Sequence, residues 1–112
     1  MSTENDVITK PDTEVITPPK TRAKIQVRPP SEYKVIYLND EVTTMNFVVD
    51  SLVTVFDYTE DTAHGITEKI HADGFAIVAV LPYEIAEQKG IEVTVMARNN
   101  SFPLQVTLEP AD

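Results

Sequence analysis

The fold is decided by Tyr37-Leu-Asn-Asp-Glu-Val-Thr-Thr-Met-Asn-Phe47, a stretch that joins a short apolar strand to an amphipathic helix. Three polar residues, Asn39, Asp40 and Glu41, stand at the junction. Thr43 or Thr44 is placed to cap the helix that follows. A strand-to-helix junction gathers hydrogen-bond acceptors at one rim of a fold, so the sequence predicts a polar site there.

The residues on either side of the junction show the periodicities of a strand and a helix. Tyr33-Lys-Val-Ile-Tyr-Leu38 is rich in β-branched and aromatic residues, which is typical of a strand. From about Thr44 to Phe56, apolar residues recur at spacings of three and four, which predicts an amphipathic helix. Its apolar face consists of Met45, Val48, Val49, Leu52, Val53, Val55 and Phe56.

A second helix is predicted between Thr59 and Gly74. Thr59 suits the N-cap position, and the acidic residues that follow it favour the positive end of a helix. Gly74 is a natural C-terminal stop. The apolar face contains Ala63, Ile66 and Ile70, with Thr67 beside them.

The remaining chain predicts a strand, a helix and a last strand. The uninterrupted apolar run 75–81 indicates a central strand, and Pro82 suits the first position of a helix. That helix ends near Asn99, and residues 102–108 form the last strand with Leu104 inward. The predicted fold is therefore α+β: a small two-layer β-α-α-β-α-β sandwich with three helices on one face of a three-stranded antiparallel sheet. The inward residues of the third helix are expected to be Ile85, Ala86, Val93, Met96 and Ala97, and those of the last strand Leu104, Val106 and Leu108.

Composition narrows the class of protein. The chain has 112 residues, enough for one domain, and it has no cysteine, which excludes disulfides and thiolate metal sites. Residues 31–112 carry fourteen acidic and four basic residues, so this part repels phosphate backbones and we expect no binding to nucleic acid. No apolar stretch reaches the roughly 18 residues of a membrane span, and the start shows no signal peptide, so we expect a cytoplasmic protein without a membrane partner.

Residues 1–30 differ from the rest of the chain. They hold five of the eight prolines and carry five basic against four acidic residues. Apolar residues are too sparse in this segment to offset the entropy cost of ordering it. We therefore predict a flexible arm over residues 1–30 and a single core domain over residues 31–112.

Two patterns allow more than one interpretation. His71 lies at the edge of the apolar face of the second helix, where it can accept a hydrogen bond from a ligand or simply interact with the helix dipole. His64, Glu68 and His71 share one side of that helix, where they could bind a metal or form a solvated face. No nucleophile elbow, phosphate loop or dinucleotide fingerprint occurs, so we expect neither an enzyme nor a cofactor.

The sequence also resembles a known family. Pro30-Ser-Glu-Tyr-Lys-Val-Ile-Tyr-Leu-Asn-Asp-Glu-Val-Thr-Thr-Met-Asn-Phe-Val-Val49 is similar to the start of the bacterial ClpS adaptors. The resemblance continues through His71–Gly74, Glu84–Lys89, Ala97-Arg98, Phe102–Leu104 and Thr107–Glu109. It implies an adaptor that binds destabilising N-terminal residues (Leu, Phe, Tyr or Trp) and delivers their proteins to a Clp AAA+ unfoldase and its peptidase. It also implies a fold similar to the C-terminal domain of the ribosomal stalk protein, and a stalk-like interaction module without a pocket is the alternative function.

The resemblance implies a role for particular residues. The N-terminal domain of a ClpA-type or ClpC-type unfoldase would contact Glu84 and Lys89, and the unfoldase would engage residues 1–30. Glu41 departs from the family pattern, which has Asp at this position, and Thr67 stands where many members have Met. The α-amino group of the substrate would be bound by Asn39, Asp40, Glu41 and His71, its backbone by Thr43, and its side chain by a pocket of Met45, Val48, Thr67, Ile70 and Leu104, with Met45 as a gate against β-branched residues.

Overall fold

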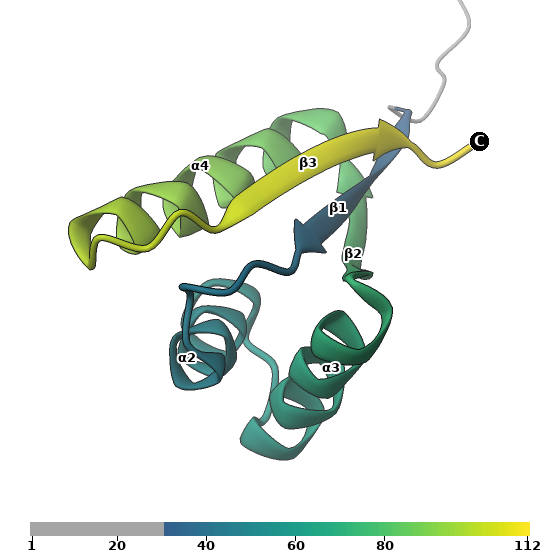
Figure 1. Ribbon diagram of the computed structural model, residues 1–112. Helices are drawn as coiled ribbons and strands as arrows, with labels where there is room; N and C mark the ends of the chain where they lie inside the picture. Colours follow the sequence, from purple (N-terminus) through teal and green to yellow (C-terminus); the bar gives the residue numbers. More distant parts are fainter. Residues whose placement is uncertain (1–30) are drawn as a thin grey trace, which may run out of the picture.

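The computed structural model describes residues 31–112, and the arm predicted for residues 1–30 lies outside them. The order of elements is β-α-α-β-α-β, as predicted (Figure 1). The elements are β1 (Glu32–Leu38), α2 (Met45–Phe56), α3 (Glu60–Asp73), β2 (Phe75–Pro82), α4 (Tyr83–Asn99) and β3 (Gln105–Pro110).

The sheet has the strand order β2-β1-β3, and both pairings are antiparallel. The expectation that residues 75–81 form the central strand is wrong, because β1 occupies the centre and β2 lies at an edge. The apolar run of β2 is instead divided between the two faces of the sheet. Ala76 and Val78 are buried, whereas Phe75 and Ile77 are about half exposed. Continuous hydrophobicity therefore did not indicate burial on both faces.

The three helices lie on one face of the sheet, which confirms the predicted two-layer architecture. α2 and α3 lie side by side beyond the end of β1, while α4 runs along β3 (Figure 1). Their apolar residues form one core with Val35 and Tyr37 of β1. The core consists of Val35, Tyr37, Phe47, Val48, Val49, Leu52, Val55, Ala63, Ile70, Ala76, Val78, Ala86, Val93, Ala97 and Leu104.

Helix α2 begins where the sequence predicts a cap. Thr44, rather than Thr43, is the N-cap, and its hydroxyl accepts a hydrogen bond from the backbone N–H of Phe47 at 3.1 Å. The buried Ser51 donates to the carbonyl of Val48 and lies 2.8 Å from the hydroxyl of Tyr37. Burial raises the pKa of Tyr37, and the hydrogen bond with Ser51 offsets only part of this effect. The polar groups inside the core are thus paired with one another.

Helix α3 also follows its predicted signals. The hydroxyl of Thr59 accepts from the N–H of Thr62 at 3.3 Å, and Gly74 ends the helix with a positive φ of 89°. A left-handed residue at this position is most readily glycine, because a side chain would strain the backbone. The helix is continuous through Gly65.

Three expectations about the C-terminal half are wrong. Pro82 is the last residue of β2 and the N-cap of α4, and Tyr83 takes the first helical position. Ile85 is exposed, because the buried face of α4 is formed by Ala86, Val93 and Ala97. The last strand begins at Gln105 instead of residue 102, because Phe102 is held by a hydrogen bond from its N–H to the carbonyl of Ala97 at 2.8 Å.

Among residues 31–112, no helix combines the length and the apolar character that crossing a membrane requires.

Candidate functional site

The junction after β1 is held against the end of α3. The backbone N–H of Asn39 donates to the carbonyl of Gly74 at 2.9 Å. Gly74 follows the last turn of α3, and that turn carries Ile70 and His71. Two segments more than thirty residues apart in the sequence therefore meet here. The structure therefore brings the junction next to the end of α3 that carries His71.

Asp40 organises the loop in which it lies. Its Oδ1 accepts hydrogen bonds from the N–H groups of Val42 at 2.8 Å and Thr43 at 2.7 Å, and its Oδ2 accepts from the hydroxyl of Thr43 at 2.7 Å. A carboxylate has about four lone-pair positions, so roughly one remains for a ligand. Sequence reasoning missed this internal role, although Asp side chains commonly accept a hydrogen bond from the backbone two residues further on, as Asp40 does from Val42.

The electrostatic surroundings of Asp40 favour its charged form. Burial acts to raise the pKa of the carboxyl, but the hydrogen bonds from Thr43 and Val42 and the positive charge of Arg98 outweigh burial. The pKa of Asp40 therefore lies below its ordinary value. The neighbouring side chains of Asn39, Glu41 and His71 are exposed. The junction thus presents a carboxylate that is ionised at neutral pH beside accessible polar groups.

The apolar residues predicted for the pocket come from three separate segments. Val48 lies on α2, Thr67 and Ile70 on α3, and Leu104 just before β3, and all four are buried. The hydroxyl of Thr67 donates to the carbonyl of Ala63 at 2.7 Å, so its polar group is satisfied within α3. Thr67 is therefore compatible with an apolar wall.

Met45 differs from the other predicted pocket residues. It is the first residue of α2 and is 45% exposed. A flexible, exposed thioether can move without disturbing the core. Its place at the rim suits the predicted role of a gate.

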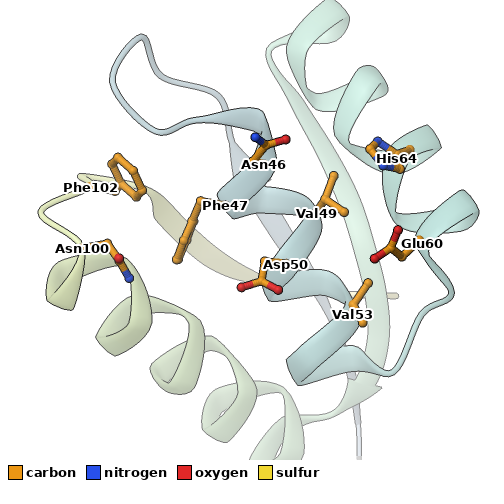
Figure 2. Close-up of a pocket in the computed structure, with 9 residues that line it drawn as sticks. All are labelled: Asn46, Phe47, Val49, Asp50, Val53, Glu60, His64, Asn100 and Phe102. Carbon is orange, nitrogen blue, oxygen red and sulfur yellow. The ribbon is translucent and has the colours of Figure 1, made fainter.

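Two hollows lie near these residues. A cavity of about 210 Å³ is bounded by the junction on one side and the segment leading into β3 on the other, and it is lined by Leu38, Asn39, Asp40, Pro103 and Gln105. A wider hollow of about 480 Å³ lies over the outer side of α2 (Figure 2). The wider hollow shares no residue with the predicted peptide site, and its lining mixes polar and apolar side chains: Asn46, Phe47, Val49, Asp50, Val53, Glu60, His64, Asn100 and Phe102.

The structure does not arrange His64, Glu68 and His71 as a metal site. His64 lines the wider hollow, whereas His71 lies two turns further along α3. Within residues 31–112, no group of three or more His, Cys, Asp or Glu side chains is arranged to hold a metal ion.

The two residues predicted to contact an unfoldase lie on α4. Glu84 is exposed in the first turn. Lys89 is half-buried, and its Nζ donates to the carbonyl of Val55 at 2.9 Å. Lys89 therefore has a structural role that its sequence position did not indicate.

The fold and the site define a class of protein: a small α+β binding domain with an acceptor-lined rim above buried apolar side chains. Residues 28–107 match the family model described as ATP-dependent Clp protease adaptor protein ClpS. The chain belongs to this family of adaptors, as its sequence motifs predicted.

Individual relatives cover most of the chain. It is 42% identical over 90 residues to the ClpS adapter of Sodalis glossinidius, a match that covers 80% of this chain and 85% of the relative. It is 45% identical over 92 residues to the ClpS adapter of Shewanella denitrificans, covering 82% and 90% of the two chains. The solved structure of Agrobacterium tumefaciens ClpS2 bound to L-phenylalaninamide is similar with a TM-score of 0.71 and 40% identity, covering 73% of this chain and 99% of the other.

Proposed function

We propose that this chain binds proteins with a destabilising N-terminal residue (Leu, Phe, Tyr or Trp) and delivers them to a Clp AAA+ unfoldase and its peptidase. The observation that carries the proposal is the hydrogen bond from Asn39 to Gly74, because it joins the polar junction to the turn that bears His71. A relative of similar fold has been solved with L-phenylalaninamide, a molecule with a free amino group and an apolar side chain.

The junction has the chemistry that an α-amino group requires. A protonated amino group is a cation with three hydrogen-bond donors, so its site needs acceptors and negative charge. Asn39, Glu41 and His71 offer accessible acceptors, and Asp40 keeps a negative charge with about one free acceptor position. The excess of ten negative charges over residues 31–112 attracts cations to the domain as a whole. The hydroxyl of Thr43 donates to Asp40, which leaves its oxygen free to accept from the peptide backbone.

The side chain of the N-terminal residue would enter between α2, α3 and the segment before β3. Burying a Leu or Phe side chain gains about 1.5–3 kcal/mol. Val48, Thr67, Ile70 and Leu104 supply the apolar wall. Met45 lies at the rim, where its side chain would exclude residues branched at Cβ.

Delivery would use a surface separate from this site. Glu84 is exposed on α4 and is available to the N-terminal domain of a ClpA-type or ClpC-type unfoldase. Residues 1–30 would be the segment that the unfoldase engages. The site of action would be the bacterial cytoplasm, in line with the expectation drawn from the sequence.

Fluorescence polarisation with short peptides tests the amino-group site. Peptides that begin with Leu or Phe are expected to bind, whereas a Val peptide and an N-acetylated Leu peptide are expected to bind at least about tenfold more weakly. Equal affinity for the free and acetylated Leu peptides would contradict the proposal and favour a stalk-like interaction module. The His71→Ala variant should weaken binding of the free Leu peptide while the thermal unfolding midpoint stays close to that of the wild type, since the side chain is exposed.

A further inference from the structure

Arg98, in the last turn of α4, bonds to the chain on both sides of Pro103. Its Nη1 donates to the carbonyl of Phe102 at 2.8 Å and to that of Leu104 at 3.0 Å. Pro103 has no N–H of its own, and β3 begins only at Gln105, after this segment. The guanidinium therefore satisfies carbonyls that lie ahead of the strand ladder.

The backbone of the same turn reinforces this arrangement. The N–H of Ser101 donates to the carbonyl of Arg98 at 3.0 Å, and the N–H of Phe102 donates to that of Ala97 at 2.8 Å. Ser101 has a positive φ of 61°, which reverses the chain sharply. Backbone and side-chain hydrogen bonds together fix residues 102–104 relative to α4.

The segment that Arg98 holds carries two side chains that reach other elements. Leu104 is only 1% exposed and belongs to the hydrophobic core. The ring of Phe102 packs edge-on against that of Phe47, with 5.2 Å between the centroids. Leu104 is also the one proposed pocket residue that comes from neither α2 nor α3. Its position therefore depends on what fixes residues 102–104.

Arg98 also acts on the opposite side of the site. Its positive charge helps to lower the pKa of Asp40 in the junction. The cavity of about 210 Å³ separates the two segments, with Asn39 and Asp40 on one side and Pro103 and Gln105 on the other. A single side chain thus interacts with both segments that border this cavity.

We propose that Arg98 is a positioning residue for recognition of the N-terminal residue, because it holds Leu104 in the pocket wall and keeps residues 102–104 in a fixed relation to the junction. This inference rests on the proposed function. Arg98 acts through Leu104 and Asp40 and makes no contact with the substrate. Its loss therefore weakens selection of the side chain more than binding of the amino group.

The test compares Arg98→Gln, Arg98→Lys and a matched control, Asn100→Ala. The control removes a different hydrogen bond at the end of α4, the one that Nδ2 of Asn100 donates to the carbonyl of Met96 at 2.9 Å. It keeps the hydrogen bonds from Arg98 to Phe102 and Leu104. Dissociation constants are measured for peptides beginning with Leu and with Ala, because their ratio reports the contribution of the pocket. Arg98→Gln should lower the preference for Leu about three- to tenfold, an effect of up to about 1.4 kcal/mol.

The other two variants distinguish a positioning role of Arg98 from a general loss of domain stability. Asn100→Ala should keep the wild-type preference for Leu. Arg98→Lys should restore part of it, because lysine keeps the charge and donors but lacks the planar fork of arginine. An unchanged Leu-to-Ala ratio in Arg98→Gln, or an equal loss in the control, overturns the positioning role. If Arg98→Gln fails to fold, as judged by circular dichroism, Arg98→Lys is compared with the wild type in the same way.

A measurement without peptide distinguishes this inference from the proposed function. Methyl NMR signals of Leu104 and the titration of the Asp40 carboxyl are recorded for the wild type and Arg98→Gln. We expect shifted Leu104 signals and a higher pKa for Asp40 in the variant. Wild-type protein that binds neither peptide contradicts the proposed function. Unchanged Leu104 signals in the variant contradict the role of Arg98 whether or not peptide binds.

Discussion

Lys89 in α4 and Val55 in α2 are joined by a hydrogen bond of 2.9 Å from the ammonium group to the backbone carbonyl. The same ammonium group lies 5.8 Å from the centroid of the Phe56 ring. The last turn of α2 contains no basic residue. The C-terminal end of a helix favours positive charge. Lys89 therefore supplies, from the neighbouring helix α4, the positive charge that the last turn of α2 lacks.

Replacing Lys89 with Met should destabilise the domain. The variant keeps much of the apolar stem but loses the hydrogen bond to Val55 and the contact with Phe56. We expect the free energy of unfolding to fall by about 1 kcal/mol, measured by urea denaturation. An unchanged unfolding midpoint would show that water replaces the ammonium group at no cost.

Glu84 is the better residue for testing the unfoldase surface. Its side chain is exposed, whereas Lys89 also forms a structural hydrogen bond with Val55. Reversing its charge in Glu84→Lys should weaken binding to the isolated N-terminal domain of a ClpA-type or ClpC-type unfoldase, measured by calorimetry. The stability of the variant should stay within about 0.5 kcal/mol of the wild type. Its affinity for a Leu peptide should not change, and a parallel loss of both interactions would argue against separate surfaces.

Asp40 should make the stability of the domain depend on pH. Its pKa is lower in the folded protein than its ordinary value of 3.8, so the folded state favours the ionised form. This contribution is present above that value and is lost as the pH falls through the folded pKa. In Asp40→Asn, stability should therefore fall most at neutral pH and approach that of the wild type in acid. Urea denaturation at pH 7 and near pH 3 measures the difference, and an equal gap at both pH values would contradict it.

Met45 should control which side chains enter the pocket. In Met45→Ala the rim widens, so peptides beginning with Val or Ile should gain up to about tenfold in affinity. This gain corresponds to about 1.4 kcal/mol of binding free energy from the burial of apolar surface. Stability should change little, because Met45 is 45% exposed. Fluorescence polarisation with Leu, Ile and Val peptides measures the selectivity. A uniform loss for all three peptides would make Met45 a general contact instead of a gate.

Local signals in the sequence are sufficient to predict the helices and strands and most of their boundaries. Thr44 and Thr59 each provide a hydroxyl at the start of a helix, and Gly74 provides the positive φ at the end of α3. These outcomes depend on backbone groups within a few residues, which is why sequence predicts them. The family motifs likewise predicted the adaptor family that the comparisons confirm.

Long-range arrangement was harder to predict. The apolar run of β2 suggested a central strand, but burial depends on which strands pair beside it, and β1 took that place. The sequence predicts the start of β3 three residues too early. Arg98 and the tight turn hold residues 102–104 outside the hydrogen-bond ladder of the sheet. The partner of Lys89 is 34 residues away in sequence, so no local pattern could reveal it. The roles assigned to the peptide-site residues stay predictions until binding is measured.

The central place of β1 has a mechanical consequence. It is the first described strand, and it is paired along its length with β2 from Glu32↔Pro82 and with β3 from Tyr33↔Pro110. A force applied to the chain ahead of Glu32 and directed along the strand loads both sets of hydrogen bonds at once, in shear. An edge strand, in contrast, can be peeled away one bond at a time. The topology therefore makes extraction of the domain by its N-terminal end act against two sets of strand hydrogen bonds at once.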